Sequence, residues 1–447
     1  MLKSFIILAF LPLFSLAQNT KGIIVSQKDN SPIDDVNVYA LHNKTGTLTN
    51  EKGEFSLNLT AKENDTIQLS HIGYITTKIA VNDLKSLNFI ISLPEDVENL
   101  SGLTIQIDPK KKLKSKLHFE KSASLKYGIY SFGSVLKDDK IYVLGGDASY
   151  SVNAWDKIRM EKPDFTMADY LRELQFQVGG QFYKDKLLIY NIKTDTWETS
   201  ELKFKKRAYQ NLNYYNNTIY AIGGKRSSTN GVFEYLEDQI EVFDLNKQTI
   251  AIDKTNPHQA INAASFTYKD NIIVMGGSTK LNAKGIKQYS NKVHLYNISS
   301  GYWYELADMP TAEEANGVLI DNKIYLIGGD NGKPLSEIQT FDLATEKWET
   351  EGKLLSGLER PAVAYSDNTI YFFENRKIYL YNTKSKQLKE YTVELGLKNA
   401  AMYYYDNKLY IIGGYIENYY SQNPSSNVYN ITIKEFETTQ PNSVRVL

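Results

Sequence analysis

The sequence predicts an all-β protein in which a small antiparallel β-sandwich precedes a six-bladed β-propeller. The chain has 447 residues, which is long for one hydrophobic core and favours at least two domains. It contains 33 Tyr and 18 Phe but only 11 Pro, an aromatic composition typical of β-strands. An apolar run ending in two glycines recurs along the last two-thirds of the chain, which indicates repeated sheets.

Residues 1–17 have the pattern of a secretory signal peptide. Lys3 provides a positive start, residues 5–16 are apolar, and residues 15–17 (Ser-Leu-Ala) resemble a cleavage site. The apolar stretch is short for a membrane span, although an uncleaved N-terminal anchor is the alternative. We therefore expect an exported protein without a transmembrane segment, located in the periplasm, on the outer-membrane surface or outside the cell.

Composition excludes several kinds of partner and chemistry. Lys and Arg total 51 against 52 Asp and Glu, so there is no basic surplus to attract nucleic acid. The sequence has no Cys, which excludes disulfides, thiolate nucleophiles and thiolate-bound metals. We expect neither a cofactor nor a metal site.

The front domain is expected over residues 21–107. Short alternating runs such as 23–25, 36–39, 55–57 and 67–69 are separated by turn formers at 30–32, 50–53 and 63–65. Runs of this length and punctuation indicate a small antiparallel sandwich. His42 and His71 lie far apart in the sequence, so a turn or surface role is expected for both rather than a metal pair.

The same segment resembles the carboxypeptidase regulatory-like domain, an immunoglobulin-like β-sandwich. The resemblance rests on Gly22, Val25, Pro32, Ile33, Val36, Val38, the run 47–50, Gly53, Glu54, Phe55, Ile72, Gly73 and Tyr74. It implies an accessory module of the kind common in exported Bacteroidetes-type proteins, with outer-membrane association through this domain as one option. Residues 108–126 follow as a Lys-rich linker, because the five lysines between 110 and 116 show no apolar period.

Residues 127–447 contain the repeat. Five copies combine an apolar run with a Gly-Gly pair, at 141–146, 219–224, 272–277, 324–329 and 409–414. A sixth copy, 370–373, continues into Glu374 and Asn375 where the glycines are expected. An Asn or Asp stands six positions before the first glycine, or its equivalent, in every copy, so each copy is expected to form the second strand of a tight hairpin.

A second hairpin is expected after each copy. An aromatic residue is followed seven positions later by a bulky one in the pairs Tyr190/Trp197, Phe243/Ile250, Tyr296/Trp303, Phe341/Trp348, Tyr381/Leu388 and Tyr429/Phe436. Two hairpins make a four-stranded sheet, and six such sheets can bury their faces only by closing into a ring. The outermost strand of the last sheet is expected from either 115–126 or 437–447.

The Gly-Gly pair followed by Tyr and Trp resembles the kelch repeat, which implies a six-bladed kelch β-propeller. The fifth unit departs from the pattern by lacking its glycines, and the second, fifth and sixth units lack Trp. Local distortion of those blades is expected, without a change in blade number.

The ligand face is expected where the connections between the second and third strands lie. These connections span 147–189, 225–242, 278–295 and 415–428, and long loops carry function more often than tight turns. The first loop is expected to hold a helix near 167–174. The expected binding residues on this face are Arg207, Arg226, His258, Glu314, Arg360, Trp155, Arg159 and Tyr419.

Each candidate residue has a structural alternative. An Arg beside a Glu can bind a carboxylate or form an acid–base pair, but kelch blades also use Arg structurally. Exposed aromatic side chains can stack on a sugar or simply pack against neighbouring loops.

Two functions are therefore open. The first is an exported binding or scaffold protein that recognises a glycan or an envelope protein. The second is a sugar-active enzyme, because exported six-bladed kelch propellers include the sialic acid mutarotases, which this chain resembles in architecture. In that reading Arg360 and Glu314 would act on an anionic sugar, although no match to that family is found residue by residue, and the enzyme is the less favoured reading. Galactose oxidase chemistry is excluded because its Tyr–Cys cross-link needs a Cys.

Overall fold

The structure is a computed structural model that describes residues 17–42, 44–60, 65–71, 73–96, 113–175, 182–228, 233–281 and 287–447. The chain divides into two compact units, Met1–Pro109 and Lys110–Leu447. The expected signal segment falls almost entirely outside the described residues, as do residues 108–112 of the expected linker. Within the described ranges, no helix has the length and apolar character needed to cross a membrane.

The N-terminal unit is a two-sheet sandwich. One sheet has the strand order β4-β1-β7 and the other β3-β2-β5-β6. The strands are β1 (Ala17–Ser26), β2 (Asn37–Ala40), β3 (Thr45–Leu48), β4 (Glu54–Thr60), β5 (Thr66–Ser70), β6 (Thr77–Ala80) and β7 (Ile90–Leu93), and a 3-10 turn η1 (Val81–Leu84) precedes β7. Alternate residues of both sheets, such as Ile24, Val38, Phe55 and Leu69, form one core, as the period-two pattern predicts.

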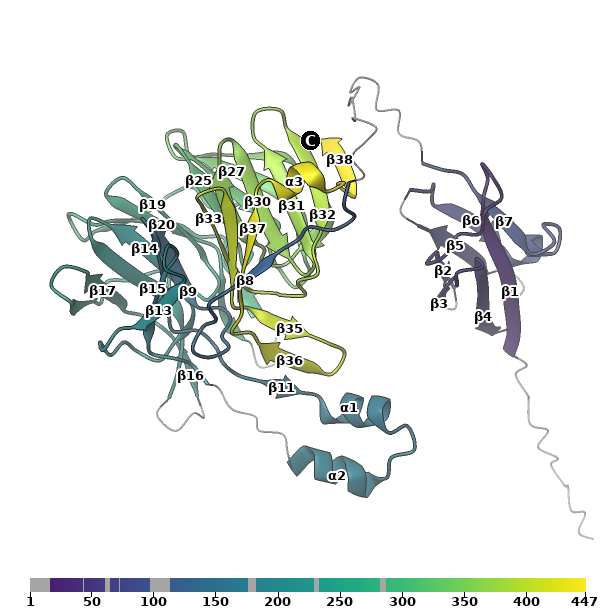
Figure 1. Ribbon diagram of the computed structural model, residues 1–447, viewed down its shortest axis with the longest axis horizontal. Coiled ribbons are helices and arrows are strands. Elements are labelled where there is room, and N and C mark those ends of the chain that lie inside the picture. Colours follow the sequence, from purple (N-terminus) through teal and green to yellow (C-terminus); the bar gives the residue numbers. More distant parts are fainter. Residues whose placement is uncertain are drawn as a thin grey trace, which may run out of the picture. The chain divides into compact units, whose positions relative to one another are not determined.

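The described part of the C-terminal unit contains six antiparallel sheets of four or five strands, which we number as blades 1 to 6 in chain order, and two smaller sheets formed by loops. Figure 1 shows how the blades are arranged. Blade 1 consists of β9 (Gly133–Lys137), β10 (Lys140–Leu144), β12 (Leu187–Asn191) and β13 (Thr196–Thr199). Blade 2 consists of β14 (Ala208–Tyr215), β15 (Thr218–Ser227), β17 (Ile240–Asp244) and β18 (Thr249–Asp253). Blade 3 consists of β19 (Ala264–Tyr268), β20 (Asn271–Met275), β23 (Val293–Asn297) and β24 (Trp303–Glu305).

Blades 4 to 6 continue the series. Blade 4 consists of β25 (Gly317–Ile320), β26 (Lys323–Ile327), β27 (Leu335–Asp342) and β28 (Lys347–Leu358). Blade 5 contains β29 (Ala362–Ser366), β30 (Thr369–Glu374), β31 (Lys377–Asn382) and β32 (Gln387–Thr392). Blade 6 contains β33 (Ala401–Tyr405), β34 (Lys408–Ile412) and β37 (Val428–Thr432). The six-bladed β-propeller expected from the repeat is confirmed.

The 2–3 loops of blades 1, 2, 3 and 6 carry further elements. They are β11 (Ser151–Val152), α1 (Ala154–Glu161) and α2 (Met167–Gln175) in blade 1, β16 (Glu234–Leu236) in blade 2, β21 (Ser278–Leu281) and β22 (Lys287–Tyr289) in blade 3, and β35 (Tyr415–Glu417) and β36 (Ser421–Pro424) in blade 6. The helix expected near 167–174 is α2, whereas α1 was not expected. Strands β11, β36 and β35 pair into a small sheet, so the loops of blades 1 and 6 are joined (Figure 1).

The ring closes with a strand from before blade 1. The outermost strand of blade 6 is β8 (Glu120–Ser122), which pairs with β37. The C-terminal strand β38 (Ser443–Val446) instead extends blade 5 beyond β32. Of the two closures left open by the sequence, the one from 115–126 is the one observed.

Two sequence expectations need correction here. Part of the expected linker belongs to the propeller: Leu117 is buried and its amide donates to Thr392, because this segment has apolar side chains to bury between its lysines. The sixth aromatic pair is not a hairpin either. Tyr429 pairs with Lys121 of β8, and Phe436 lies in the short helix α3 (Glu435–Thr438).

The other five aromatic pairs are cross-strand neighbours of the third and fourth strands. Tyr190 faces Trp197 with ring centroids 4.9 Å apart, and Phe341 faces Trp348 at 4.7 Å. Such stacked pairs contribute about 0.5–1.5 kcal/mol beyond their area burial. The five cross-strand pairs mark the register of the outer hairpins of blades 1 to 5.

The second glycine of each pair holds neighbouring blades together. Gly146 has φ +97° and donates its amide to the carbonyl oxygen of Arg207 in blade 2 at 2.9 Å. The same bond recurs around the ring as Gly224 to Ala260, Gly277 to Glu313, Gly329 to Leu358, Asn375 to Leu397 and Gly414 to Ile129. We call these six bonds the inter-blade bonds; the last of them closes the circle from blade 6 to blade 1.

Blade 5 keeps its inter-blade bond without glycines. Asn375 and Arg376 adopt φ +42° and +69° and form a two-residue turn between β30 and β31. Asn tolerates this left-handed region better than most residues. Blade 5 therefore has a tight turn where the 2–3 loops of blades 1, 2, 3 and 6 carry additional elements.

Candidate functional site

One residue of each blade marks the mouth of the propeller. It lies just before the inner strand or, in blade 2, at its first residue. This is the face that carries the 2–3 loops, because the start of strand 1 and the end of strand 2 meet at one edge of an antiparallel sheet. These mouth residues are Tyr130, Ala208, Ile261, Glu314, Arg360 and Lys398. In five blades the mouth residue pairs with the residue after the Gly-Gly pair, namely Asp147, Lys225, Ser278, Asp330 and Tyr415.

A cavity of about 230 Å³ lies on the propeller axis below the mouth. Its walls come from the inner strands of all six blades or the residues just before them. Its polar groups include Ser131, Gln210, Asn211, Asn316, Arg360 and Asn399. A pocket that is central, concave and lined by a few convergent polar groups is the usual form of a ligand site.

The backbone around the cavity is held in an uncommon conformation. Ser131, Tyr209, Asn262 and Asn399 follow the mouth residues of their blades and have φ between +48° and +64°. The amide of Tyr209 donates to the carbonyl of Ser131 at 2.6 Å, and that of Asn262 donates to Tyr209 at 3.2 Å. Left-handed backbone at non-glycine residues gathers at ligand sites, where surrounding contacts hold it in place.

Arg360 is the charged residue that lines this cavity. Its Nε atom is buried and has no hydrogen-bond partner, and within the described part of the chain its guanidinium forms no ion pair. Burial lowers the pKa of Arg360, and the negative charge of Glu314 opposes that shift. A guanidinium nevertheless stays protonated in proteins, so the cavity contains an unneutralised positive charge.

Glu314 is held in a different way. Its carboxylate accepts from the Nδ2 of Asn262 at 2.8 Å and from the Oγ of Ser278 at 2.6 Å, and it forms an ion pair with Lys287 at 2.9 Å. Arg360 and Glu314 therefore influence each other electrostatically without direct contact. The geometry does not form the acid–base pair that the enzyme reading expects.

Tyr130, Tyr209 and Tyr415 form a tyrosine cluster at the mouth, in blades 1, 2 and 6. The hydroxyl of Tyr209 donates to Asp147 at 2.9 Å, and the ammonium of Lys225 lies 4.8 Å from the Tyr209 ring centre. The ring of Tyr130 meets that of Tyr415 edge-on at 5.0 Å. Burial raises the pKa of Tyr209, with the charge of Asp147 adding to the shift, so this hydroxyl is a donor at every physiological pH.

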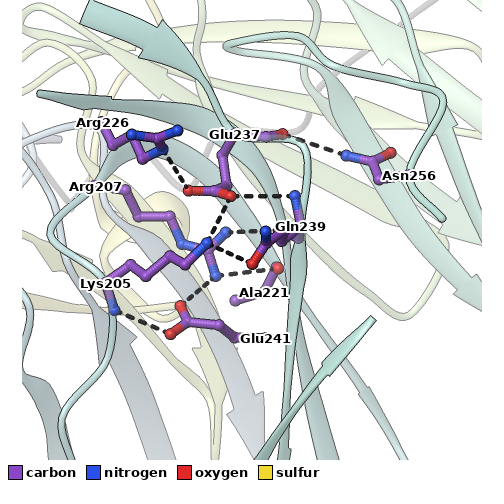
Figure 2. Close-up of polar contacts among 8 residues, drawn as sticks. All are labelled: Lys205, Arg207, Ala221, Arg226, Glu237, Gln239, Glu241 and Asn256. Carbon is purple, nitrogen blue, oxygen red and sulfur yellow. Dashed lines mark hydrogen bonds and ion pairs between the residues drawn. The ribbon is translucent and has the colours of Figure 1, made fainter. Parts of the chain in front are cut away.

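Arg207 does not belong to the mouth. Its side chain is fully buried and pairs with Glu241 at 2.7 Å, while its Nη2 also donates to the carbonyl of Ala221 at 3.1 Å (Figure 2). Arg207 precedes the mouth residue Ala208, and successive residues of an extended chain point to opposite sides. Arg207 therefore has a structural role inside the blade, which corrects the expectation that it contacts a ligand.

Arg226 and Lys205 share a second buried carboxylate in the same region. Glu237 is fully buried and lies 3.0 Å from the Lys205 ammonium and 3.4 Å from the Nε of Arg226 (Figure 2). Arg226 is partly exposed, and its guanidinium lies 5.0 Å from the ring centre of Tyr235. A stacked and exposed Arg–Tyr pair is a common contact group at interfaces.

His258 is buried rather than displayed. Its Nδ1 lies 2.8 Å from the Nδ1 of His294, and its Nε2 lies 2.8 Å from the carbonyl oxygen of Gly276. Burial lowers the pKa of His258 to about 4, so the ring is neutral at physiological pH. This corrects the expectation that His258 binds a ligand.

Within the described residues there is no group of three or more acidic or histidine side chains placed to hold a metal ion.

Trp155, Arg159 and Tyr419 all lie on the joined loops of blades 1 and 6. Trp155 and Arg159 belong to α1, and the Trp155 ring meets those of Phe165 and Tyr170 edge-on. Tyr419 is 63 % exposed between β35 and β36. The loops are tied together by the hydroxyl of Tyr420, which donates to Glu161 at 2.9 Å.

Exposed apolar side chains concentrate on the loops of blades 6, 1 and 2. They are Ile416 and Tyr419 in blade 6, Tyr150, Trp155, Met160, Met167, Leu171 and Phe182 in blade 1, and Phe233 and Tyr235 in blade 2. We call this set the loop-face patch. The other exposed large apolar residues of the described propeller lie on outer strands or beside them: Ile252, Tyr302, Tyr304, Leu355 and Val446.

Comparison with protein families agrees with this architecture. Residues 171–374 match the family model described as the KLHDC2/KLHL20/DRC7 Kelch-repeats domain. Residues 20–105 match the model described as the CarboxypepD_reg-like domain.

Curated relatives match parts of the chain at low identity. Kelch-like protein 38 of Rattus norvegicus is 22% identical over 285 residues, covering 62% of this chain and 47% of that protein. Kelch repeat and BTB domain-containing protein 2 of cowpox virus is 25% identical over 199 residues, covering 44% and 34%. The chain thus spans less than half the length of these relatives. A solved structure titled "Structure of YjhT" aligns with a TM-score of 0.53 and 12% identity, over 68% of this chain and 95% of that one, which shows a shared fold.

Proposed function

Because the chain carries a CarboxypepD_reg-like domain followed by a kelch-repeat propeller, we propose that it is an exported binding protein that engages a glycan or protein ligand with the loop face of the propeller. The observation that supports this is the loop-face patch. Exposed apolar side chains that gather on the loops of one face can form a binding surface. Tyr, Trp, Phe and Met are also the residue types enriched at the centres of interfaces.

Exchange of two patch residues tests the proposal. Phe233 and Tyr419 are 59 % and 63 % exposed, so the double variant Phe233→Ala/Tyr419→Ala should fold normally. A glycan array and a pull-down from a cell-envelope fraction would first identify the ligand. Binding of that ligand should then weaken about tenfold or more, since truncated hot-spot aromatics commonly cost about 2 kcal/mol or more.

The control is Tyr302→Ala/Tyr304→Ala. These tyrosines are 67 % and 52 % exposed but lie at or beside the outer strand β24 of blade 3. This variant should bind like the wild type. Equal loss of binding in both double variants, or no ligand found with a well-folded sample, would overturn the proposal.

The second candidate is an enzyme acting on an anionic sugar. The observation in its favour is the positive charge of Arg360 in a central cavity. Acceleration of N-acetylneuraminate anomer interconversion, followed by NMR and abolished by Glu314→Gln, would support this candidate. Catalysis by Glu314 would require one of its three present partners to be displaced, and for this reason binding ranks first.

A further inference from the structure

Asp147 and Asp330 occupy equivalent places at the mouth. Each directly follows the Gly-Gly pair of its blade and pairs with the mouth residue of that blade. The Oδ1 of each carboxylate accepts from the amide two residues further along the chain, at 2.8 Å for Asp147 and 3.0 Å for Asp330. The Oδ2 of each accepts a tyrosine hydroxyl, from Tyr209 at 2.9 Å and from Tyr289 at 3.1 Å. The same arrangement therefore occurs twice.

The two arrangements differ in a third contact. The ammonium of Lys287 lies 3.7 Å from the Oδ2 of Asp330 and 6.0 Å from the ring centre of Tyr289. A carboxylate, a tyrosine and a lysine side chain thus lie together at Asp330. Asp147 forms no ion pair within the described residues, although it is only 4 % exposed. Because a buried carboxylate is costly without a cation, Asp147 lacks the group that completes the equivalent arrangement.

Two cations lie near Tyr209 without supplying that group. The ammonium of Lys225 is 4.8 Å from the Tyr209 ring centre, but its ion pair is with Glu234, at 2.7 Å. The charge of Arg360 acts on Tyr209 electrostatically, and Arg360 forms no ion pair within the described part of the chain. The carboxylate of Asp147 is therefore free to pair with a cation from outside the chain.

Lys225 shows which kind of group this part of the mouth holds. Its ammonium lies over two tyrosine rings, that of Tyr209 and, at 5.8 Å, that of Tyr183. The faces of aromatic rings attract cations. The Lys225 side chain is 21 % exposed, so a ligand can reach this place from solvent by displacing it, while Lys225 keeps its ion pair with Glu234.

We propose that Asp147 and the ring of Tyr209 bind the side-chain ammonium of a lysine in a protein ligand, with Lys225 moving aside toward Glu234. This deepens the proposed function and rests on it, because the ligand has to approach from the loop face. A lysine is favoured over an amino sugar because a lysine side chain completes the equivalent arrangement at Asp330. The contact combines an ion pair with a cation–π interaction.

The test measures binding of two probes to the full chain by NMR titration. The probes are Nα-acetyl-lysine amide and Nα-acetyl-norleucine amide, which differ only in the ammonium group. The lysine probe should bind at least tenfold more tightly, because charge-assisted hydrogen bonds contribute about that much to affinity. Asp147→Asn keeps the size of the side chain and removes its charge, so it should abolish the preference. Equal binding of the two probes by the wild type, or binding of neither, would overturn the proposal.

Lys225→Met gives an independent readout that does not depend on the folding of Asp147→Asn. It removes the resident ammonium and keeps an unbranched side chain, so the lysine probe should bind several-fold more tightly than to the wild type. An unchanged affinity would contradict the displacement of Lys225. Binding to Lys225→Met but not to the wild type would show that Lys225 fills the site itself, and the proposal would be wrong.

Asp253→Asn is the matched control. Asp253 also accepts a tyrosine hydroxyl, from Tyr296 at 2.6 Å, and forms no ion pair within the described residues, but it lies on the outer strand β18 of blade 2. The preference for the lysine probe should be unchanged in this variant. Loss of the preference in Asp253→Asn as well as in Asp147→Asn would contradict a site at the mouth.

D-Glucosamine and D-glucose form the second pair of probes and distinguish a glycan from a protein as the source of the ammonium group. A preference for glucosamine as large as that for the lysine probe, and absent in Asp147→Asn, would contradict the assignment to a lysine. Failure of the proposed function remains distinguishable. Phe233→Ala/Tyr419→Ala tests capture of the whole ligand by the loop face, whereas Asp147→Asn tests one ammonium contact.

Discussion

At the scale of single residues, the glycines with positive φ allow neighbouring blades to approach closely and to form the inter-blade bonds. A Cβ at Gly224, where φ is +84°, would lie 2.5 Å from the carbonyl oxygen of Ala208. Gly224→Ala should therefore lower the free energy of unfolding by about 2–4 kcal/mol, from backbone strain and steric clash together. Chemical denaturation of the propeller measures this.

Gly301 provides the matched control for that change. It has φ +73° with no atom within 4 Å of an added Cβ, so Gly301→Ala should cost about 1 kcal/mol, from strain alone. Equal losses in the two variants would show that close packing at the Gly-Gly pair is unimportant.

The buried histidine makes stability depend on pH. Burial lowers the pKa of His258 to about 4 from a usual 6.5, so between these values the unfolded chain binds more protons than the folded one. The contribution of the neutral His258 to the free energy of unfolding is therefore complete above about pH 6.5. It decreases by about 1–3 kcal/mol as the pH falls toward 4. His258→Asn should reduce the drop in unfolding free energy between pH 7 and pH 4.5.

His118 serves as the control for this pH dependence. It is exposed, so His118→Asn should keep the full drop. A wild-type-like drop in His258→Asn would contradict the assignment to His258.

At the scale of elements, β8 is the strand that closes the ring, and engineered cysteines can test it in a chain without native Cys. Glu120 and Asn430 are direct partners across β8 and β37, at the Cα separation that a disulfide spans. Glu120→Cys/Asn430→Cys should oxidise to an intramolecular disulfide, detected by mass spectrometry.

The C-terminal strand provides two comparisons. Val444→Cys/Lys389→Cys should also cross-link, because these residues pair across β38 and β32. Val444→Cys/Asn430→Cys should not, and a disulfide in that variant would favour the alternative closure.

Repeated elements could be predicted from the sequence, and single ones could not. The Gly-Gly pairs and aromatic spacings recur, so six sheets, their inner hairpins and the outer hairpins of blades 1 to 5 followed directly, whereas the outer hairpin predicted for blade 6 is absent. Strand β8 consists of Glu120, Lys121 and Ser122, which show no apolar alternation, and its pairing is decided by distant residues. The helix α1 was missed because Trp155 and Met160 are exposed rather than periodic core positions.

At the site, too, residue roles could be predicted where they depend on the position within the repeat, and not where they depend on a single side-chain contact. Arg360 and Glu314 were identified as mouth candidates because their charges stand just before inner strands. Arg207 was misassigned because it lies one position earlier in its blade, and this single step turns a side chain from the cavity into the blade. Glu374 was seen only as a missing glycine, since nothing local shows that its carboxylate accepts hydrogen bonds from the amides of Glu359 and Arg360.

At the scale of the whole molecule, the propeller is a regular ring with an asymmetric face. The six inter-blade bonds and the cavity follow the repeat, whereas the loop-face patch occupies blades 6, 1 and 2 and the tight turn beside Arg360 belongs to blade 5. A closed ring with an apolar patch and a charged cavity is suited to the ligand binding that we propose.

Amide hydrogen exchange of the full chain, with and without the glycan or protein captured by it, tests this account most directly. We predict that the ligand protects described amides within 147–186, 225–239 and 415–427 and around Arg360. Protection confined to the tight turns on the opposite face, or to residues 17–96, would contradict it.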